Sequence, residues 1–360
     1  VGLAEATMIP LWLDVTLDGH PEPVWVTHEG VFSLQPDAQG NPSLVTLDVP
    51  LAAATGEGAP LVASTVDVDG DGTLEIMRCE MELQVLRVTA PNTLSLDKTP
   101  LPGPPGVTLR DMAVGDLNRD GLSDVVLGFA VRSPEKAENA GFPDQVLMNL
   151  GHGRFELHPV VPPHDGYTNG VTLGDLDADG RLDLIESFNF SAVTQPSRIL
   201  LNRTEIGARV PVFEEVSASH DTGTAGMGAC LGDVNEDGWL DIYNTSIGVD
   251  QLSLGRPSGG YDDGTFSGGF HHQWGEKDLR SQWSPSFVDV NGDSLLDVTV
   301  RHGGSPSAVG VGLVGLSLAT QEADLVYIQT DDGSFERVDV PFDPSAPGQG
   351  RQMVTGDWDR

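Results

Sequence analysis

The sequence repeats an acidic motif that places oxygen-bearing side chains at positions 1, 3, 5 and 9. The motif is Asp-x-[Asp/Asn]-x-Asp-[Gly/Ser]-x-x-[Asp/Glu], and its five full copies begin at residues 67, 116, 175, 233 and 289. Oxygens at this spacing, with the backbone carbonyl of position 7, can surround one hard cation. Ca²⁺ accepts oxygen ligands in flexible geometry, whereas Mg²⁺ demands a tighter octahedron. The sequence therefore predicts about five calcium sites, within a range of roughly four to six.

Each full copy supplies four side chains and one position-7 carbonyl to its predicted site. The ligands are Asp67, Asp69, Asp71, Thr73 and Glu75; Asp116, Asn118, Asp120, Leu122 and Asp124; Asp175, Asp177, Asp179, Arg181 and Asp183; Asp233, Asn235, Asp237, Trp239 and Asp241; and Asp289, Asn291, Asp293, Leu295 and Asp297. Glycine at position 6 permits a sharp turn with φ > 0. Ser294 replaces it in the fifth copy, so we expect that site to be weaker than the other four.

Two incomplete copies extend the series at its ends. The first comprises Asp14, Asp18 and Glu22, with the neutral Thr16 at position 3. The last begins with Asp357 and Asp359, so we expect the chain to stop inside a seventh repeat. We predict weaker metal binding at both.

Two other interpretations of the motif must be weighed. Clusters of Asp, Asn and Gly commonly form solvated turns without any metal. Five accidental repeats are improbable, however, because converging carboxylates repel one another. Residues 175–186 also satisfy the EF-hand pattern, including Glu186 at position 12. The other copies carry no acid there, and their flanks resemble strands, so Glu186 is interpreted as a coincidence.

The segments around each motif predict an all-β fold. Short apolar runs precede the motifs, as at 61–66 and 171–173, and others follow, as at 124–127 and 182–185. A third run and a Gly-containing turn to a fourth come next, as at 145–149 and 154–157. Four strands per unit of about 50 to 60 residues is typical of a β-propeller blade.

The repeat starts define the expected domain organisation. Units begin near residues 8, 61, 110, 169, 227, 283 and 351, which predicts one domain over residues 1–360. We expect a seven-bladed propeller with its last blade truncated; a six-bladed ring with a spare strand is the alternative.

These residues resemble the FG-GAP/VCBS repeat family, which includes the integrin α-subunit propeller and the cartilage acidic protein-like propellers. Residues 226–244 are most similar to the latter group, and residues 147–155 resemble the family's turn between third and fourth strands. The resemblance implies that each acidic loop joins the first two strands of a blade and binds calcium. The literal Phe-Gly…Gly-Ala-Pro signature is missing, since Gly-Ala-Pro occurs once, at 58–60, and precedes a loop.

Composition narrows the classes of partner and compartment. Fifty-four acidic residues against 19 basic ones give a formal charge of −35, which disfavours nucleic acid and anionic membranes. No apolar stretch is long enough to span a membrane. Cys79 and Cys230 lie three repeats apart, so we expect two buried thiols rather than a disulfide. We expect a monomer that is secreted or on the cell surface, with a bacterial periplasm or outer surface as alternatives.

Residues outside the loops offer weaker candidates for ligand binding. His271, His272, Trp274 and Trp283 form the densest aromatic and imidazole cluster, although tryptophan there is more often core. His158, His164 and Tyr167 form a second, weaker group. Long connections at 132–143, 159–169, 188–198, 261–285 and 303–323 could carry recognition. Asn189, Asn202 and Asn244 begin N-x-[Ser/Thr] triplets that a eukaryotic host could glycosylate.

The sequence predicts a calcium-binding, non-enzymatic propeller that binds an extracellular protein or glycan. No catalytic residues are predicted, because the carboxylates are assigned to metal and no G-x-S-x-G or H-E-x-x-H motif occurs. One alternative is a calcium-dependent hydrolase or lyase acting on a polyanion, but its required basic cluster is missing, since Arg78, Arg119 and Arg181 are scattered. The other is a structural segment of a larger adhesin.

Overall fold

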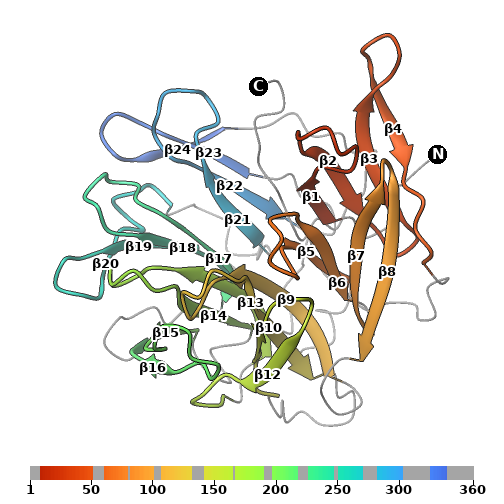
Figure 1. The fold of residues 1–360 in the computed structure, drawn as a ribbon. Coiled ribbons are helices and arrows are strands. Elements are labelled where there is room, and N and C mark those ends of the chain that lie inside the picture. The colour runs from red at the N-terminus through yellow and green to blue at the C-terminus, as the bar shows by residue number, and fades with distance from the viewer. Residues whose placement is uncertain are drawn as a thin grey trace, which may run out of the picture. The chain divides into compact units, whose positions relative to one another are not determined.

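The fold consists of six four-stranded sheets that follow one another along the chain. The computed structural model describes residues 9–51, 61–79, 82–100, 107–131, 142–164, 167–189, 197–217, 226–246, 250–270, 282–302 and 325–338. These residues contain 24 β-strands, and every sheet is built from four consecutive antiparallel strands (Figure 1). Such sheets are the blades of a β-propeller, so the all-β prediction and the four-stranded blade are confirmed.

Three blades belong to one compact unit, which also includes the segment Thr204–Val212. Their strands are β1 (Ile9–Leu13), β2 (Glu22–Val26), β3 (Val31–Pro36) and β4 (Pro42–Thr46); β5 (Val62–Val66), β6 (Glu75–Cys79), β7 (Glu82–Ala90) and β8 (Thr93–Pro100); and β9 (Val107–Gly115), β10 (Asp124–Val131), β11 (Gln145–Asn149) and β12 (Phe155–Pro159).

The other three blades form the second compact unit. Their strands are β13 (Tyr167–Gly174), β14 (Asp183–Asn189), β15 (Arg198–Asn202) and β16 (Phe213–Glu215); β17 (Gly226–Gly232), β18 (Asp241–Ser246), β19 (Gln251–Gly255) and β20 (Tyr261–Asp263); and β21 (Gln282–Val288), β22 (Asp297–His302), β23 (Leu325–Gln329) and β24 (Phe335–Val338). The prediction of a single domain stays a prediction.

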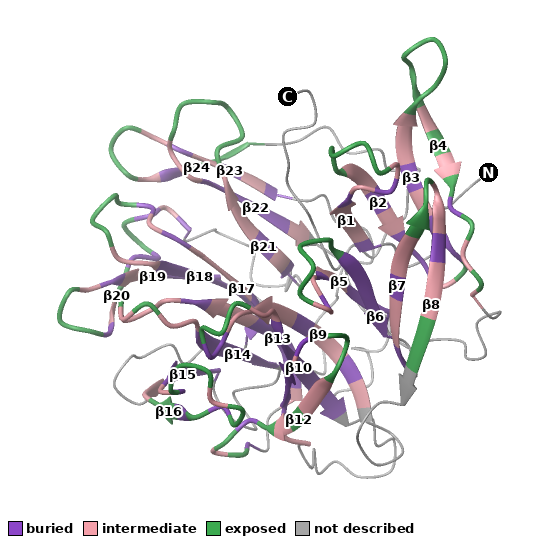
Figure 2. Cartoon of the chain, in the orientation of Figure 1, coloured by how far each residue is buried: buried purple, intermediate pink, exposed green. Residues whose placement is uncertain are grey.

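Burial decreases from the middle strands of a blade to its outer strand. All five residues of β6, β11 and β15 are buried, whereas the fourth strands β4 and β24 alternate or are mostly exposed (Figure 2). A strand covered on both faces needs apolar residues at consecutive positions, and an edge strand needs them at alternate positions. This difference explains why strands such as β11 and β15 appear in the sequence as nearly continuous apolar runs.

The hydrophobic core lies between neighbouring blades of each unit. In the first unit, Val66, Met77 and Leu83 of the second blade belong to one cluster with Val125 and Phe129 of the third. In the second unit, Tyr243 and Phe270 pack with Tyr327 and Phe335. The ring centroid of Phe270 lies 4.8 to 5.3 Å from the ring centroids of the other three. Each blade therefore depends on its neighbour to bury its faces, as repeat architectures do.

The described residues form six blades and do not support the seven-bladed prediction. Asp357 and Asp359, on which a seventh unit depends, lie outside the described residues. Among the helices of the described part of the chain, none is long and apolar enough to cross a membrane.

Candidate metal-binding loops

Every blade joins its first strand to its second through one copy of the acidic motif. The full copies connect β5 to β6, β9 to β10, β13 to β14, β17 to β18 and β21 to β22, and the incomplete copy at Asp14 connects β1 to β2. A strand therefore flanks each loop on both sides. The EF-hand alternative is wrong, because that motif needs flanking helices, and Glu186 instead pairs with Arg198 inside the β14–β15 ladder.

The aspartate at position 1 organises the turn by accepting backbone N–H groups. In the fourth copy, Asp233 Oδ1 accepts from Asp237 N at 2.9 Å, and its Oδ2 accepts from Gly238 N at 2.8 Å. The other copies repeat these two bonds, which are those of an extended Asx turn. The loop is thus preformed by its own side chain.

Positions 4 and 6 of the loops both adopt positive φ. At position 6 the φ values are 82° to 89° for glycine and 73° for Ser294. The Ser294 N–H reaches Asp289 Oδ2 at 2.9 Å, so serine keeps the turn despite its strained conformation. At position 4 the non-glycine residues Arg119, Ala178 and Glu236 lie at 55° to 58°. The motif itself gave no signal for this second left-handed position.

The carboxylate at position 9 ties the loop to two strands of its own blade. Asp183 Oδ2 accepts from Leu176 N at 2.8 Å, and its Oδ1 accepts from Asn202 N, at the end of β15, at 2.7 Å. The same pair of bonds occurs at Asp124, Asp241 and Asp297, and all four carboxylates are fully buried. Position 9 therefore has a structural role that prediction as a simple metal ligand did not include.

Burial makes these position-9 groups reluctant to ionise. Desolvation raises the pKa of Asp124, Asp183 and Asp241 to about 6, although two backbone N–H bonds oppose the shift in each case. Nearby loop carboxylates raise these pKa values further. Desolvation also raises the pKa of Glu75 above its ordinary value. A divalent cation in the loop would act in the opposite direction, because it favours the charged forms.

In the loops with aspartate at position 3, one carboxylate oxygen of that residue accepts no hydrogen bond from the described residues. Asp69 Oδ1 and Asp177 Oδ1 are buried, and neither finds a hydrogen-bond donor among the residues that the structure describes. An unsatisfied buried carboxylate oxygen is costly, and a metal ion would satisfy it. These two loops therefore fit a hard cation best.

The carboxylates of three loops converge closely enough to share one ion. Within each of the following sets, one oxygen from every residue lies within 4.8 Å of the others: Asp14, Asp18 and Glu22; Asp67, Asp69 and Asp71; and Asp175, Asp177 and Asp183. The Asp14 set was predicted to be the weakest, yet its oxygens converge like those of the stronger copies. Thr16 Oγ1 donates to Glu22 Oε1 at 2.7 Å and so completes this loop differently.

Asparagine at position 3 closes the loop on itself. Asn235 Nδ2 donates to Asp237 Oδ2 at 3.1 Å, and Asn118 and Asn291 make the equivalent bond at 3.0 and 2.8 Å. The position-3 amide therefore occupies one carboxylate oxygen of position 5 in these loops. The five full copies therefore fall into two kinds, with two Asp loops and three Asn loops.

Arginine side chains reach two of the loops from neighbouring strands. Arg203 Nη1 lies 2.9 Å from Asp177 Oδ2 and 3.2 Å from Asp179 Oδ2, and this pairing raises the pKa of Arg203. Arg87 Nε lies 3.9 Å from Asp69 Oδ2 and 4.0 Å from Glu75 Oε1. Neither arginine belongs to the motif, so sequence spacing gave no reason to select them.

The histidine and aromatic candidates are distributed over separate parts of the chain. His271, His272 and Trp274 lie outside the described residues, and Trp283 is 6% exposed within β21. His164 is buried, with its Nε2 3.4 Å from Asp144 Oδ2. These positions indicate core roles for Trp283 and His164.

His158 and Tyr167 lie in strands of different blades. His158 Nε2 lies 3.6 Å from Glu156 Oε1 in β12, and Tyr167 begins β13. Most of the long connections proposed for recognition lie outside the described residues.

Two of the three candidate glycosylation sites occupy protected positions. Asn202 and Asn244 are buried, which leaves their amides inaccessible to a glycan in the folded chain. The side chain of Asn189 is outside the described residues. Cys79 and Cys230 are not joined in a disulfide. Cys79 is buried, whereas Cys230 is half-buried rather than buried as expected.

Comparison with solved structures supports the propeller class. A lectin from Agrocybe aegerita that specifically recognises non-reducing terminal N-acetylglucosamine is 15% identical, with a TM-score of 0.54 over 96% of this chain and 81% of the lectin. A protein from Lactobacillus plantarum is 13% identical, with a TM-score of 0.50 over 93% of this chain and 82% of its own. At these identities the likeness shows the fold alone. No protein-family model and no curated protein matches the sequence.

Proposed function

We propose that this chain is a calcium-stabilised, non-enzymatic β-propeller that binds a glycan or a protein outside the cell. We further propose that its acidic loops are of the FG-GAP/VCBS type. The observation that carries the calcium proposal is the buried, unpartnered oxygen of Asp69 and of Asp177, each within a preformed acidic loop. Oxygen-only donor sets of this kind suit Ca²⁺ better than softer metals.

Calcium would stabilise the blades rather than take part in chemistry. Each loop begins at the end of a first strand, and its position-9 carboxylate fastens the second and third strands, as at Asp183. An ion in the loop would hold that carboxylate charged and relieve the repulsion among its neighbours. Calcium sites of extracellular modules are tuned to the millimolar calcium outside cells, so an extracellular location would keep the proposed sites filled.

The glycan half of the proposal takes its ligand class from the propeller neighbour. The Agrocybe aegerita lectin, whose fold this chain resembles, specifically recognises non-reducing terminal N-acetylglucosamine. The strongly acidic surface of this chain, with a formal charge of −35, favours neutral over polyanionic glycans. A neutral sugar is therefore the first ligand to test.

The test is retention of the protein on an array of immobilised glycans that includes chains ending in N-acetylglucosamine. In calcium, we expect retention on a defined subset of neutral glycans, with competition by the matching free sugar. Excess chelator should reduce retention, because the loops that fasten the blades would loosen. Failure to retain any glycan, while far-ultraviolet circular dichroism reports folded protein, would overturn glycan binding.

A further inference from the structure

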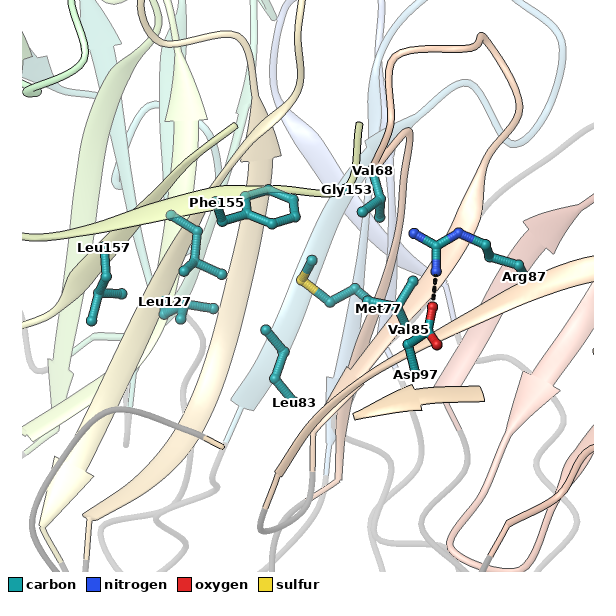
Figure 3. A pocket seen from close by; sticks show the side chains of 11 residues that line it. Val68, Met77, Leu83, Val85, Arg87, Asp97, Leu127, Gly153, Phe155 and Leu157 are labelled. Atoms are coloured by element: carbon teal, nitrogen blue, oxygen red, sulfur yellow. Dashed lines mark hydrogen bonds and ion pairs between the residues drawn. The ribbon is translucent and has the colours of Figure 1, made fainter. Parts of the chain in front are cut away.

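An apolar cavity of about 420 Å³ lies between the blade β5–β8 and the blade β9–β12. Met77 and Leu83 line it from one blade, and Leu127, Phe155 and Leu157 line it from the other (Figure 3). Met77 and Leu127 are fully buried, so the cavity extends into the core shared by these blades. A cavity of this size and lining is typical of sites that hold the apolar part of a small ligand.

Polar groups gather at one side of this cavity. Arg87 lines it together with Asp97, and the two side chains form an ion pair (Figure 3). Arg87 also lines an adjoining hollow of about 560 Å³, whose wall includes Asp69 and Asp71 of the first full acidic loop. Gly153 lines both spaces, and a Cβ built on it would lie 3.5 Å from Arg87 Nη2. The apolar cavity therefore has a polar mouth at the acidic loop.

The charge at this mouth is negative. Asp69, Asp71 and Asp97 line it, together with one guanidinium, Arg87, and the imidazole of His152. That guanidinium is already engaged with Asp97, and its Nε lies 3.9 Å from Asp69 and 4.0 Å from Glu75. The mouth carboxylates outnumber the guanidinium of Arg87, so they would repel an anionic head group. An ammonium group would be attracted by the same carboxylates, because Arg87 does not neutralise all of them.

We propose that this cavity binds a small amphipathic amine. The apolar chain or ring would lie among Met77, Leu83 and Phe155, and the ammonium would lie at the mouth with Asp69 and Asp97. The proposal goes beyond calcium and glycan binding and does not depend on either, because its evidence is the cavity and the carboxylates that line its mouth.

The experiment measures binding of three probes that share one alkyl chain: octylammonium, 1-octanol and octanoate. Isothermal titration at neutral pH, first in chelator, compares their dissociation constants. The alkyl chain should give all three measurable affinity, and the head group should set their order. We expect octylammonium to bind about fivefold more tightly than octanol, and octanoate to bind most weakly. Equal affinities, or binding of none of the three, would overturn the proposal.

Two variants with matched controls locate the site. Leu157→Phe adds volume at an exposed lining position and should weaken the binding of all three probes, whereas Leu44→Phe, at another exposed leucine on β4, should not. Asp97→Asn removes a mouth carboxylate and breaks its ion pair with Arg87. The affinity for octylammonium should therefore fall, and the affinity for octanoate should rise. Asp262→Asn breaks a similarly exposed pair with Arg256, 3.1 Å apart, and should change neither. If neither Leu157→Phe nor Asp97→Asn changed the affinity for any probe, and the thermal midpoint of both variants stayed the same, the assignment to this cavity would be overturned.

Repeating the titration in calcium separates this proposal from the calcium proposal. If calcium fills the loop of Asp69 and Asp71, the preference for octylammonium over octanol should shrink, while octanol affinity stays the same. An unchanged preference would contradict calcium at this loop and leave the amine site standing. If octylammonium did not bind in chelator, the amine site would be contradicted, and the calcium proposal would be unaffected.

Discussion

At the scale of single residues, position 3 separates the loops into two kinds. Asp177 presents a buried oxygen with no described hydrogen-bond donor, whereas Asn235 turns its amide onto Asp237 at 3.1 Å. Asparagine at position 3 has an amide nitrogen where aspartate has a second carboxylate oxygen. The amide donates a hydrogen bond to the carboxylate at position 5, whereas the aspartate oxygen can only accept. Loops with aspartate at this position should therefore fill at lower calcium than loops with asparagine.

Another buried acid, Asp250, gives the protein a pH dependence that is independent of the loops. Its Oδ2 accepts from Tyr243 Oη at 2.7 Å, and its Oδ1 accepts from Ser246 N at 2.9 Å. Burial raises its pKa from 3.8 to about 7 despite both bonds. The folded state thus binds a proton that the unfolded state has already lost. Stability must fall as pH rises through this window, and the full penalty is present above pH of about 7.

Asp250→Asn should remove this dependence, since the neutral amide can accept from Ser246 N and donate to Tyr243. Between about pH 5 and about pH 8, the unfolding free energy of the wild type should fall by about 3 kcal/mol more than that of the variant. Urea unfolding in chelator at both pH values gives the comparison, because the loop carboxylates contribute equally to both proteins. Parallel pH profiles would show that Asp250 is already ionised in the fold.

At the scale of elements, the acidic loops fasten strands within a blade and also join neighbouring blades. Asn149, which ends β11, donates its N–H to Asp124 of its own loop at 2.7 Å. Its side-chain Nδ2 donates to Val68 O in the preceding blade at 3.2 Å. Gln329 repeats this arrangement at the end of β23, with bonds to Asp297 and to Val234 O. In these two blades the third strand therefore connects two successive loops.

This arrangement predicts different consequences for two carboxylates of one loop. Asp183→Ala removes the acceptor of two buried N–H groups and should cost about 2 to 4 kcal/mol of unfolding free energy even in chelator. Asp177→Ala removes only a partly exposed ion pair with Arg203 and should cost less than about 1 kcal/mol there. In calcium, Asp177→Ala should show its larger effect, since it loses the added stability of one bound ion.

Chemical denaturation of both variants, with and without calcium, gives the four values needed. If Asp183→Ala and Asp177→Ala were equally destabilising in chelator, the structural role of position 9 would be contradicted. If Asp177→Ala kept the full calcium increment, Asp177 would not be a ligand.

The sequence predicted the parts of this fold that repeat with a fixed spacing. Strands around Asp175 and Asp183 could be recognised because apolar runs flank a motif that fixes its own turn. The left-handed Ala178 could not, because only the closed turn requires that φ. Arg203 lies 26 residues beyond Asp177 and meets it only because β15 ends beside the loop. The cavity near Met77 depends on side-chain packing between two blades, about which spacing carries no information.

At the scale of the whole molecule, each of the six blades in the described residues carries one acidic loop, and the chain as a whole is strongly acidic. Five bound divalent ions would change the formal charge of −35 to about −25, so calcium would relieve part of the self-repulsion of the folded state. One site at about 100 times its Kd adds about 2.7 kcal/mol, so five independent sites at that ratio would together add roughly 13 kcal/mol. Stability is therefore the property in which calcium should be most visible.

The most direct measurement of the central claim is a thermal melt in calcium and in excess chelator, with bound metal counted on the same sample by elemental analysis. We predict about five calcium ions per chain, between roughly four and six, and a large drop of the melting midpoint in chelator. One ion or none, with an unchanged melting midpoint, would contradict the account and identify the loops as ordinary acidic turns.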